Sequence, residues 1–291
     1  MEQPPSTTPS AGPGSVPAVP PAAALAALLP ADVDLATGAG LRHEAARPVW
    51  YGMVWSRLGR GELAWAHWDR VRLPALQPWI AAERGRVLRE LGLHRRAEAL
   101  EWPALLAADD AVDAAMLRVS LTADAVGTGD RERAHRRLQA AARAVAELPD
   151  GPRAARQRLR LAWVRVEVAA LLGEPLPGEG LPVWDADAQA PVQPPDAAWG
   201  TGFHAAKGLL FGGLVSGDLR LLDAAARLAP PVLKWAVHLA RAEACDDPAA
   251  ATTAATAAAA AWQVVVPPCD HAGEVADTTT ARRLRAPRDP G

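Results

Sequence analysis

The chain has very few of the aromatic residues that favour strands. Its 291 residues include only two Phe and one Tyr, and Ala and Leu dominate the 50% that are apolar. Ala and Leu are strong helix formers, whereas β-branched and aromatic residues favour strands. Eleven Trp supply the bulk that an alanine-rich interior would otherwise lack. The composition therefore predicts an all-α fold, with enough residues for one large domain or two ordinary ones.

Cysteine, lysine and net charge are also scarce. Two cysteines, Cys245 and Cys269, cannot staple a fold of this size and are typical of a reducing cytosol. The formal net charge of −2 gives no overall attraction to nucleic acid or to a membrane. Only Lys207 and Lys234 are lysines among the 31 basic residues. This preference for arginine, with abundant Ala, Pro and Gly, indicates a GC-rich bacterial genome.

The sequence shows neither a leader nor a membrane-spanning run. Its N-terminus reads MEQPPSTTPS, with an acidic residue where a signal peptide needs a basic one. The apolar stretch from Ala22 to Leu29 is too short to span a bilayer. We therefore expect a cytoplasmic protein that has no membrane partner.

No catalytic or metal-binding pattern is recognisable. The seven histidines form no His-Glu-x-x-His pattern, and there is no Cys-x-x-Cys pair. The stretch with Gly200, Gly202 and Lys207 lacks the spacing of a phosphate-binding loop. Cys269 and His271 are neighbours in a predicted tail, with nothing to orient them for catalysis or chelation. The sequence therefore predicts a protein that is not an enzyme and that has no metal and no cofactor.

A helix–turn–helix pattern, by contrast, recurs after 33 residues. The recurring small residues are Gly52, Gly59 and Ala64, then Gly85, Gly92 and Ala97. A third unit is four residues longer, turns at 127–130 and ends near Pro149. A repeat of this length is typical of stacked helical hairpins.

The three units, over residues 46–149, resemble tetratricopeptide repeats (TPRs). Small residues allow the two helices of each hairpin to cross closely; these are Gly52, Ala64, Gly85, Ala97, Ala104, Ala134 and Ala141. Large residues fill the gap between helices, with Trp55 and Leu88 on first helices and Trp68 and Leu138 on second helices. Glu101 in the middle repeat departs from this bulky position. The resemblance implies a solenoid whose first helices line a concave surface.

Four segments are predicted along the chain. They are a disordered tail with a short helix over 1–43, TPR-like repeats over 44–150, further irregular helical hairpins over 151–262 and a disordered basic tail over 263–291. In the third segment we expect a helix at 153–172, a hairpin at 196–228, and a helix at 231–244 partnered by the alanine run 249–261. The predicted fold is an all-α, right-handed superhelical solenoid of about five helix–turn–helix hairpins.

The resemblance also implies a function, that of a non-enzymatic adaptor or scaffold that binds a peptide or a partner protein. Side chains of the first helices that are not committed to packing are the candidates for partner binding: Met53, Arg57, Glu83, Arg84, Arg89 and Arg118. Arginines on such a surface favour carboxylates or phosphates by bidentate hydrogen bonding. The alternative for each of them is a solvated side chain with no ligand.

Tryptophans cluster in the first two repeats. They are Trp50, Trp55, Trp65, Trp68, Trp79 and Trp102. We expect most of them to pack between hairpins; the alternative is that they line a groove that binds a partner's side chains.

Charge is segregated along the sequence. Residues 97–130 hold seven acidic residues and one arginine, whereas 131–165 hold ten arginines and three acidic residues. Arginines that share a helix face are Arg133 with Arg137, and Arg153 with Arg156 and Arg160. They predict, as an alternative function, a regulatory module whose anion-binding strip contacts nucleic acid. The favoured interpretation is that these faces complement the neighbouring acidic repeat, since no aromatic residues of an RNA-binding motif alternate with the arginines.

Overall fold

A computed structural model of the chain describes residues 47–182, 184–185, 190–191 and 203–265. Over these residues it contains eleven α-helices, one short 3₁₀ helix and one pair of two-residue strands. The predicted all-α class is therefore confirmed. In the described part of the chain, no helix is both long enough and apolar enough to cross a bilayer.

The first three hairpins form where the sequence places them. Their elements are α3 (Arg47–Arg57), α4 (Gly61–Trp68), η3 (Pro74–Leu76), α5 (Gln77–Glu90), α6 (His94–Leu106), α7 (Ala111–Gly127) and α8 (Arg131–Ala146). Gly59, Gly92 and Gly129 make the turns with positive φ angles of 78°, 78° and 74°. Glycine suits these positions because other residues adopt this conformation at a cost.

The remaining helices follow the prediction with one difference, and a short strand pair was not predicted. They are α9 (Pro152–Leu172), β1 (Trp184–Asp185), β2 (Ala190–Pro191), α10 (Phe203–Ser216), α11 (Leu219–Leu228), α12 (Pro231–Ala244) and α13 (Pro248–Val265). The strands are antiparallel, with Trp184 opposite Pro191. Helix α13 includes residues 263–265, which we had placed in the C-terminal tail; burial of Trp262 favours continuation of the helix past it. The rest of both predicted tails, with Cys269 and His271, lies outside the described residues.

Close approach of the helices depends on the small residues. Ala64, Ala97 and Ala134 are completely buried. A Cβ atom at Gly52 would overlap the indole of Trp68, whose Nε1 donates a hydrogen bond to the Val49 carbonyl at 3.3 Å. The first hairpin therefore requires a glycine on α3 opposite the tryptophan on α4.

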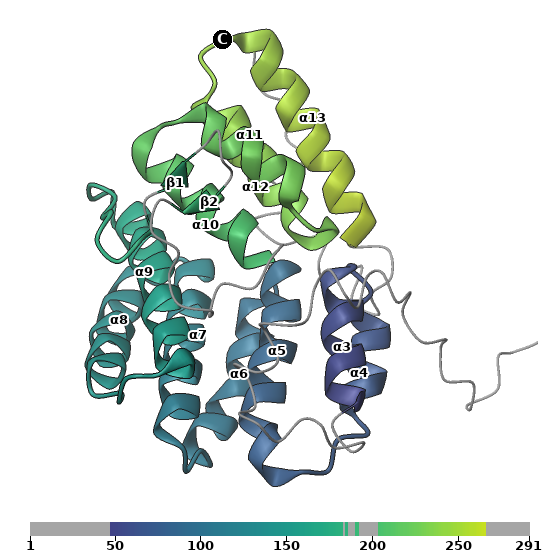
Figure 1. Cartoon of the computed structure of the whole chain (residues 1–291), viewed down its shortest axis with the longest axis vertical. Helices are drawn as coiled ribbons and strands as arrows, with labels where there is room; N and C mark the ends of the chain where they lie inside the picture. The colour runs from purple at the N-terminus through teal and green to yellow at the C-terminus, as the bar shows by residue number, and fades with distance from the viewer. Residues whose placement is uncertain (1–46, 183, 186–189, 192–202, 266–291) are drawn as a thin grey trace, which may run out of the picture.

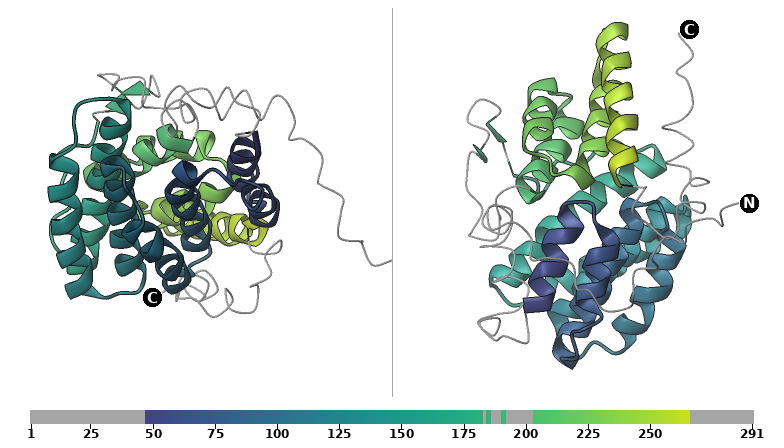
Figure 2. Two further views of the ribbon diagram at one scale, coloured as in Figure 1. Left: turned by 90° about the horizontal axis from the view of Figure 1, so that it is seen from below. Right: turned by 90° about the vertical axis from the view of Figure 1, so that its right-hand side faces the viewer.

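Consecutive helices pair into five hairpins. The pairs are α3 with α4, α5 with α6, α7 with α8, α10 with α11 and α12 with α13, while α9 packs on both α7 and α8. Helices α3 to α9 stand side by side, and α10 to α13 lie at one end of this array in Figure 1 and in the right-hand view of Figure 2. The right-handed superhelical path stays a prediction.

The last described hairpin returns to the first. Helix α12 contacts α3, and Trp262 of α13 is buried in the same core as Val49, Met53 and Trp79. This contact closes the array, so that helices from both halves of the chain surround a central cavity. The concave surface lined by first helices, which the resemblance implied, stays a prediction.

Candidate functional site

The central cavity has a volume of about 330 Å³ and is lined by side chains of α3, α5, α6, α7, α9, α10 and α12. This volume lies in the range of small-molecule sites. Six cationic side chains line it: Arg57, Arg86, Arg89, Arg156, Arg160 and Lys207. Three carboxylates of the described residues do so: Glu83, Glu90 and Glu167. Positive charge therefore predominates in the cavity.

Glu83 on α5 is the most strongly stabilised of these carboxylates. Arg86 Nε donates a hydrogen bond to Glu83 Oε2 at 3.0 Å, and Arg57 Nη2 lies 4.0 Å from Oε1. Burial alone would raise the pKa of the Glu83 carboxyl, but the guanidinium groups of Arg86, Arg57 and Arg156 outweigh burial and lower the pKa to about 2. Glu83 therefore stays ionised and orients the arginines around it.

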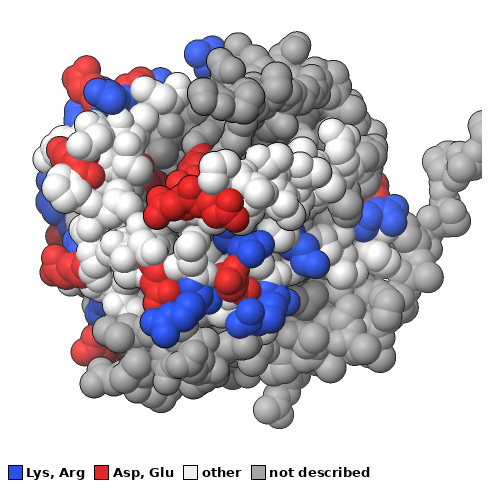
Figure 3. Space-filling model, turned by 90° about the horizontal axis from the view of Figure 1, so that it is seen from above, with Lys and Arg blue, Asp and Glu red and all other residues white. Residues whose placement is uncertain are grey.

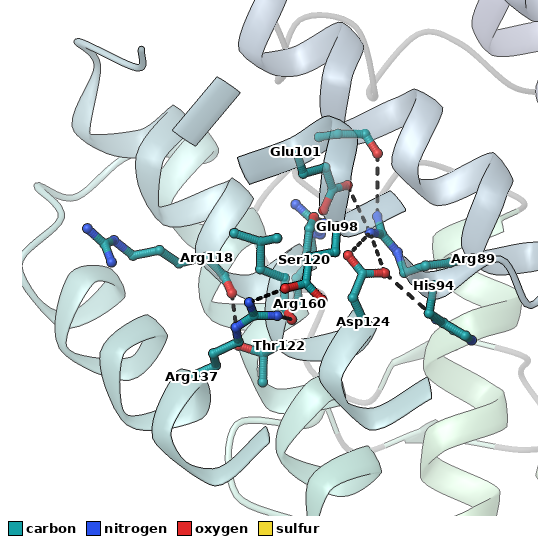
Figure 4. Close-up of polar contacts among 12 residues, drawn as sticks. Arg89, His94, Glu98, Glu101, Arg118, Ser120, Thr122, Asp124, Arg137 and Arg160 are labelled. Carbon is teal, nitrogen blue, oxygen red and sulfur yellow. Dashed lines mark hydrogen bonds and ion pairs between the residues drawn. The ribbon is translucent and has the colours of Figure 1, made fainter. Parts of the chain in front are cut away.

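A second network joins α5, α6 and α7 (Figure 4). Arg89 Nη1 donates hydrogen bonds to Glu101 Oε1 at 2.8 Å and to Asp124 Oδ2 at 3.2 Å. His94 Nδ1 lies 3.7 Å from Asp124 Oδ1. Both carboxylates are completely buried, so two acidic groups share one guanidinium away from water. A proton on one carboxyl makes this group of three charges neutral.

The proton belongs on Glu101. Burial, together with the nearby Asp124 carboxylate, raises the pKa of the Glu101 carboxyl to about 8, although Arg89 opposes the shift. Glu101 lies 33 residues after Trp68, and a Cβ atom at Gly85 would overlap its carboxylate just as one at Gly52 would overlap the indole. The middle hairpin thus places a carboxyl group where the first hairpin places its tryptophan.

We predict that replacing Glu101 by glutamine changes how stability depends on pH. Because the pKa of Glu101 is raised in the folded state, its contribution is fully present below the ordinary pKa of about 4.5 and is lost as pH rises toward 8. A glutamine amide resembles the protonated carboxyl and does not titrate. Urea unfolding followed by circular dichroism at pH 5, 6, 7 and 8 should show Glu101→Gln gaining stability relative to the wild type as pH rises. A constant difference between the two proteins over this range would contradict the raised pKa.

Two cations of the cavity make no ion pair with any described residue. Arg160 on α9 donates hydrogen bonds to Gln157 Oε1 at 3.0 Å and to Ser120 Oγ at 2.8 Å, both neutral groups. The Lys207 ammonium on α10 lies 5.0 Å from the ring centroid of Trp163 and 5.6 Å from that of Phe211. Burial is the main cause that lowers the pKa of Arg160, to about 9, and the pKa of Lys207. Among the described residues, no carboxylate forms an ion pair with either of these two cations.

The outer face of α6 is apolar, in contrast to the cationic cavity. Ala99, Trp102, Pro103 and Leu106 occur at i, i+3, i+4 and i+7 on this helix, and all four are exposed. Trp102 is 46% and Leu106 74% exposed. Surface helices ordinarily direct polar residues outward, whereas α6 buries Glu101 and exposes Trp102. Exposed apolar surface of this kind marks interaction sites.

The predicted partner-binding residues divide into three places. Arg57, Glu83 and Arg89 come together in the cavity. Met53 is 1% exposed and belongs to the core. Arg84 pairs with Asp69 and its guanidinium lies 5.1 Å from the Trp65 ring centroid, while Arg118 is exposed on α7.

The arginines of the predicted anion-binding strip fall into two groups, one paired with acidic residues and one in the cavity. Arg133 and Arg137 on α8 donate hydrogen bonds to Glu98 at 3.1 Å and 2.6 Å, and Arg153 donates one to Asp113 at 2.6 Å. These three complement the acidic repeat. Arg156 and Arg160, on the same helix as Arg153, line the cavity.

Sequence reasoning missed the lysine and the aromatic side chains of the cavity, although α10 carries a signal for them. The only two phenylalanines of the chain are Phe203 and Phe211, and Lys207 stands midway between them. The spacing i, i+4, i+8 puts all three on one helix face. All three line the cavity.

Fold and site together define, over the described residues, a helical-hairpin protein with a cationic pocket between its helices and an apolar outer face on α6. No protein-family model, no curated protein and no solved structure matches the chain.

Proposed function

We propose that the protein is a non-enzymatic adaptor or scaffold that binds a peptide or partner protein, and that the outer face of α6 is its docking surface. We define this α6 face as Ala99, Trp102, Pro103 and Leu106. The observation that carries the proposal is the exposure of a tryptophan and a leucine one turn apart on a helix whose glutamate is buried. Exposed tryptophans of this kind contribute strongly to protein–protein binding.

Charged groups beside the α6 face fit the anatomy of a protein interface. The Arg137 guanidinium carbon lies 5.8 Å from the Trp102 ring centroid, and Arg137 and Arg133 are both held by Glu98. Protein interfaces commonly have an apolar centre and a polar rim. We infer that the partner presents an apolar segment to Trp102 and Leu106. As a TPR-like protein it would do so in the cytoplasm.

We predict that the double variant Trp102→Ala/Leu106→Ala binds its partner at least tenfold more weakly than the wild type. Truncating a central aromatic side chain costs about 2 kcal/mol or more of binding free energy. The measurement is affinity capture of the full chain from its native host, followed by a titration of the captured partner with each variant. Both side chains are exposed, so thermal stability should stay nearly unchanged.

Leu73→Ala serves as the matched control, because Leu73 is also exposed, at 42%, and lies in the connection after α4 instead of on α6. It should bind the partner as the wild type does. Absence of a stoichiometric partner would count against the adaptor function. Equal affinity of the partner for the wild type and the double variant would count against the α6 face as its docking surface.

The alternative, a module that contacts nucleic acid through residues 131–165, has less support. Arg133, Arg137 and Arg153 are already bound to carboxylates. On the face shown in Figure 3, acidic and basic side chains lie close together among the described residues. Binding of oligonucleotides that weakens steeply with added salt would favour this alternative over the adaptor.

A further inference from the structure

We propose that the central cavity binds a small organic anion, one that joins a carboxylate to an aromatic or aliphatic body. This binding site is separate from the α6 face and does not depend on it. Three properties of the cavity carry the inference: its surplus of positive charge, its aromatic wall and its size.

The surplus of charge is concentrated at Arg160 and Lys207. Arg160 is bound to neutral groups of Ser120 and Gln157, and Lys207 faces aromatic rings. Glu167 and Glu90 also line the cavity, but neither forms an ion pair with Arg160 or Lys207 in the described structure. Both side chains are half-buried, and withdrawing a cation from water is costly unless it is paired. A ligand carboxylate between these two side chains would supply the missing negative charge through charge-assisted hydrogen bonds.

The wall next to Lys207 is suited to the apolar body of such a ligand. Trp163 and Phe211 lie with their ring planes 13° apart and their centroids 6.0 Å apart. Phe203 and Leu210 on α10 extend this wall, and Val119 on α7 also lines the cavity. Burying hydrocarbon against these side chains is favourable in proportion to the area removed from water.

Cavity size decides in favour of a small molecule. The volume of about 330 Å³ matches small-molecule pockets, which are mostly apolar with a few convergent polar groups. Helices from both halves of the chain contribute to it, so the bound anion would contact α7, α9 and α10 together. The ligand would therefore also stabilise the closed arrangement.

The test is isothermal titration calorimetry of the full chain with four probes of matched structure. They are 4-phenylbutyrate, which has both the charge and the aromatic body; 4-phenylbutanol, which lacks the charge; 4-phenylbutylammonium, which reverses the charge; and acetate, which lacks the body. We expect 4-phenylbutyrate to bind with one-to-one stoichiometry and at least tenfold more tightly than the alcohol or acetate, and the ammonium compound not to bind. Equal binding of the acid and the alcohol, or no binding of the acid, would overturn the proposal.

Variants locate the site. Lys207→Met and Arg160→Gln should each weaken 4-phenylbutyrate binding at least tenfold, because each removes one of the two cavity cations that form no ion pair with a described residue. Arg133→Gln is the matched control, since Arg133 is held by Asp130 and Glu98 on the outside of α8. It should bind the acid as the wild type does, and so should Trp102→Ala/Leu106→Ala. Unchanged affinity in both cavity variants, with circular dichroism showing that they are folded, would contradict this location.

Discussion

Replacing Arg89 by methionine is expected to lower the free energy of unfolding by about 3–5 kcal/mol at pH 7, the usual loss when one partner of a buried ion pair is removed. Arg89 is the one cation that reaches both Glu101 and Asp124, and both carboxylates are completely buried. Without it, the one ion-pairing contact that the described residues leave to Asp124 is His94 Nδ1, 3.7 Å from Oδ1. Urea unfolding followed by circular dichroism measures the loss.

The electrostatic cause of this loss can be separated from lost packing. The triple variant Arg89→Met/Glu101→Leu/Asp124→Asn removes all three ionisable groups and should recover most of the stability, because well-packed neutral groups often replace buried ions without loss. The single variant Arg89→Met should also lose less stability at pH 5 than at pH 7. At pH 7 a smaller fraction of the two carboxyl groups is protonated, so more negative charge is left without a partner. A triple variant as unstable as the single one would show that the methylene chain of Arg89, and not its charge, carries the effect.

Local features of the fold could be predicted because neighbours in sequence determine them. Turns at Gly59, Gly92 and Gly129 need a conformation that glycine adopts readily, and the apolar spacing of residues 153–172 defines a helix by itself. The pairing of α12 with the alanine-rich α13 follows from the short connection between them. These predictions depend on a few residues at a time.

Glu101 and Trp102 show why the site was harder to predict from the sequence than the fold. The repeat pattern marked Glu101 as a misfit, but the meaning of that misfit depends on Arg89 and Asp124, which the fold brings to it from two other helices. Trp102 was expected to pack between hairpins with most tryptophans of the first two repeats. Trp68 and Trp79 are buried, and Trp55 and Trp65 pack partly buried against the same core. Trp102 is exposed because the neighbouring buried position on α6 belongs to Glu101.

The cavity could not be predicted because closure of the array creates it. Arg160 and Lys207 come from helices separated by residues 173–202, and Ser120 comes from a third helix. A helical repeat that extends in one direction keeps such groups apart, whereas here the last described hairpin returns to α3. Contacts between distant hairpins leave no periodic pattern in the sequence.

Trp262 joins helix α13 to the core of the first hairpin. Helix α13 is rich in alanine, and among its described side chains Trp262 is the only large apolar one that is buried, at 2% exposed. Its ring lies 5.1 Å from that of Trp235 on α12, in an edge-to-face arrangement. It belongs to the core that holds Val49 and Met53 of α3.

Trp262→Ala is therefore expected to cost about 3–5 kcal/mol of unfolding free energy, as for other large-to-small substitutions in a core. Loss of Trp262 from this core should also loosen the last hairpin, so limited proteolysis should cleave the connection between α12 and α13 faster than in the wild type. Trp102→Ala removes an equally large side chain from an exposed site and should change stability by less than about 0.5 kcal/mol. Equal losses in the two variants would mean that the return of α13 to the first hairpin contributes little to holding the array closed, and that the cavity is stabilised by α9 and α10 instead.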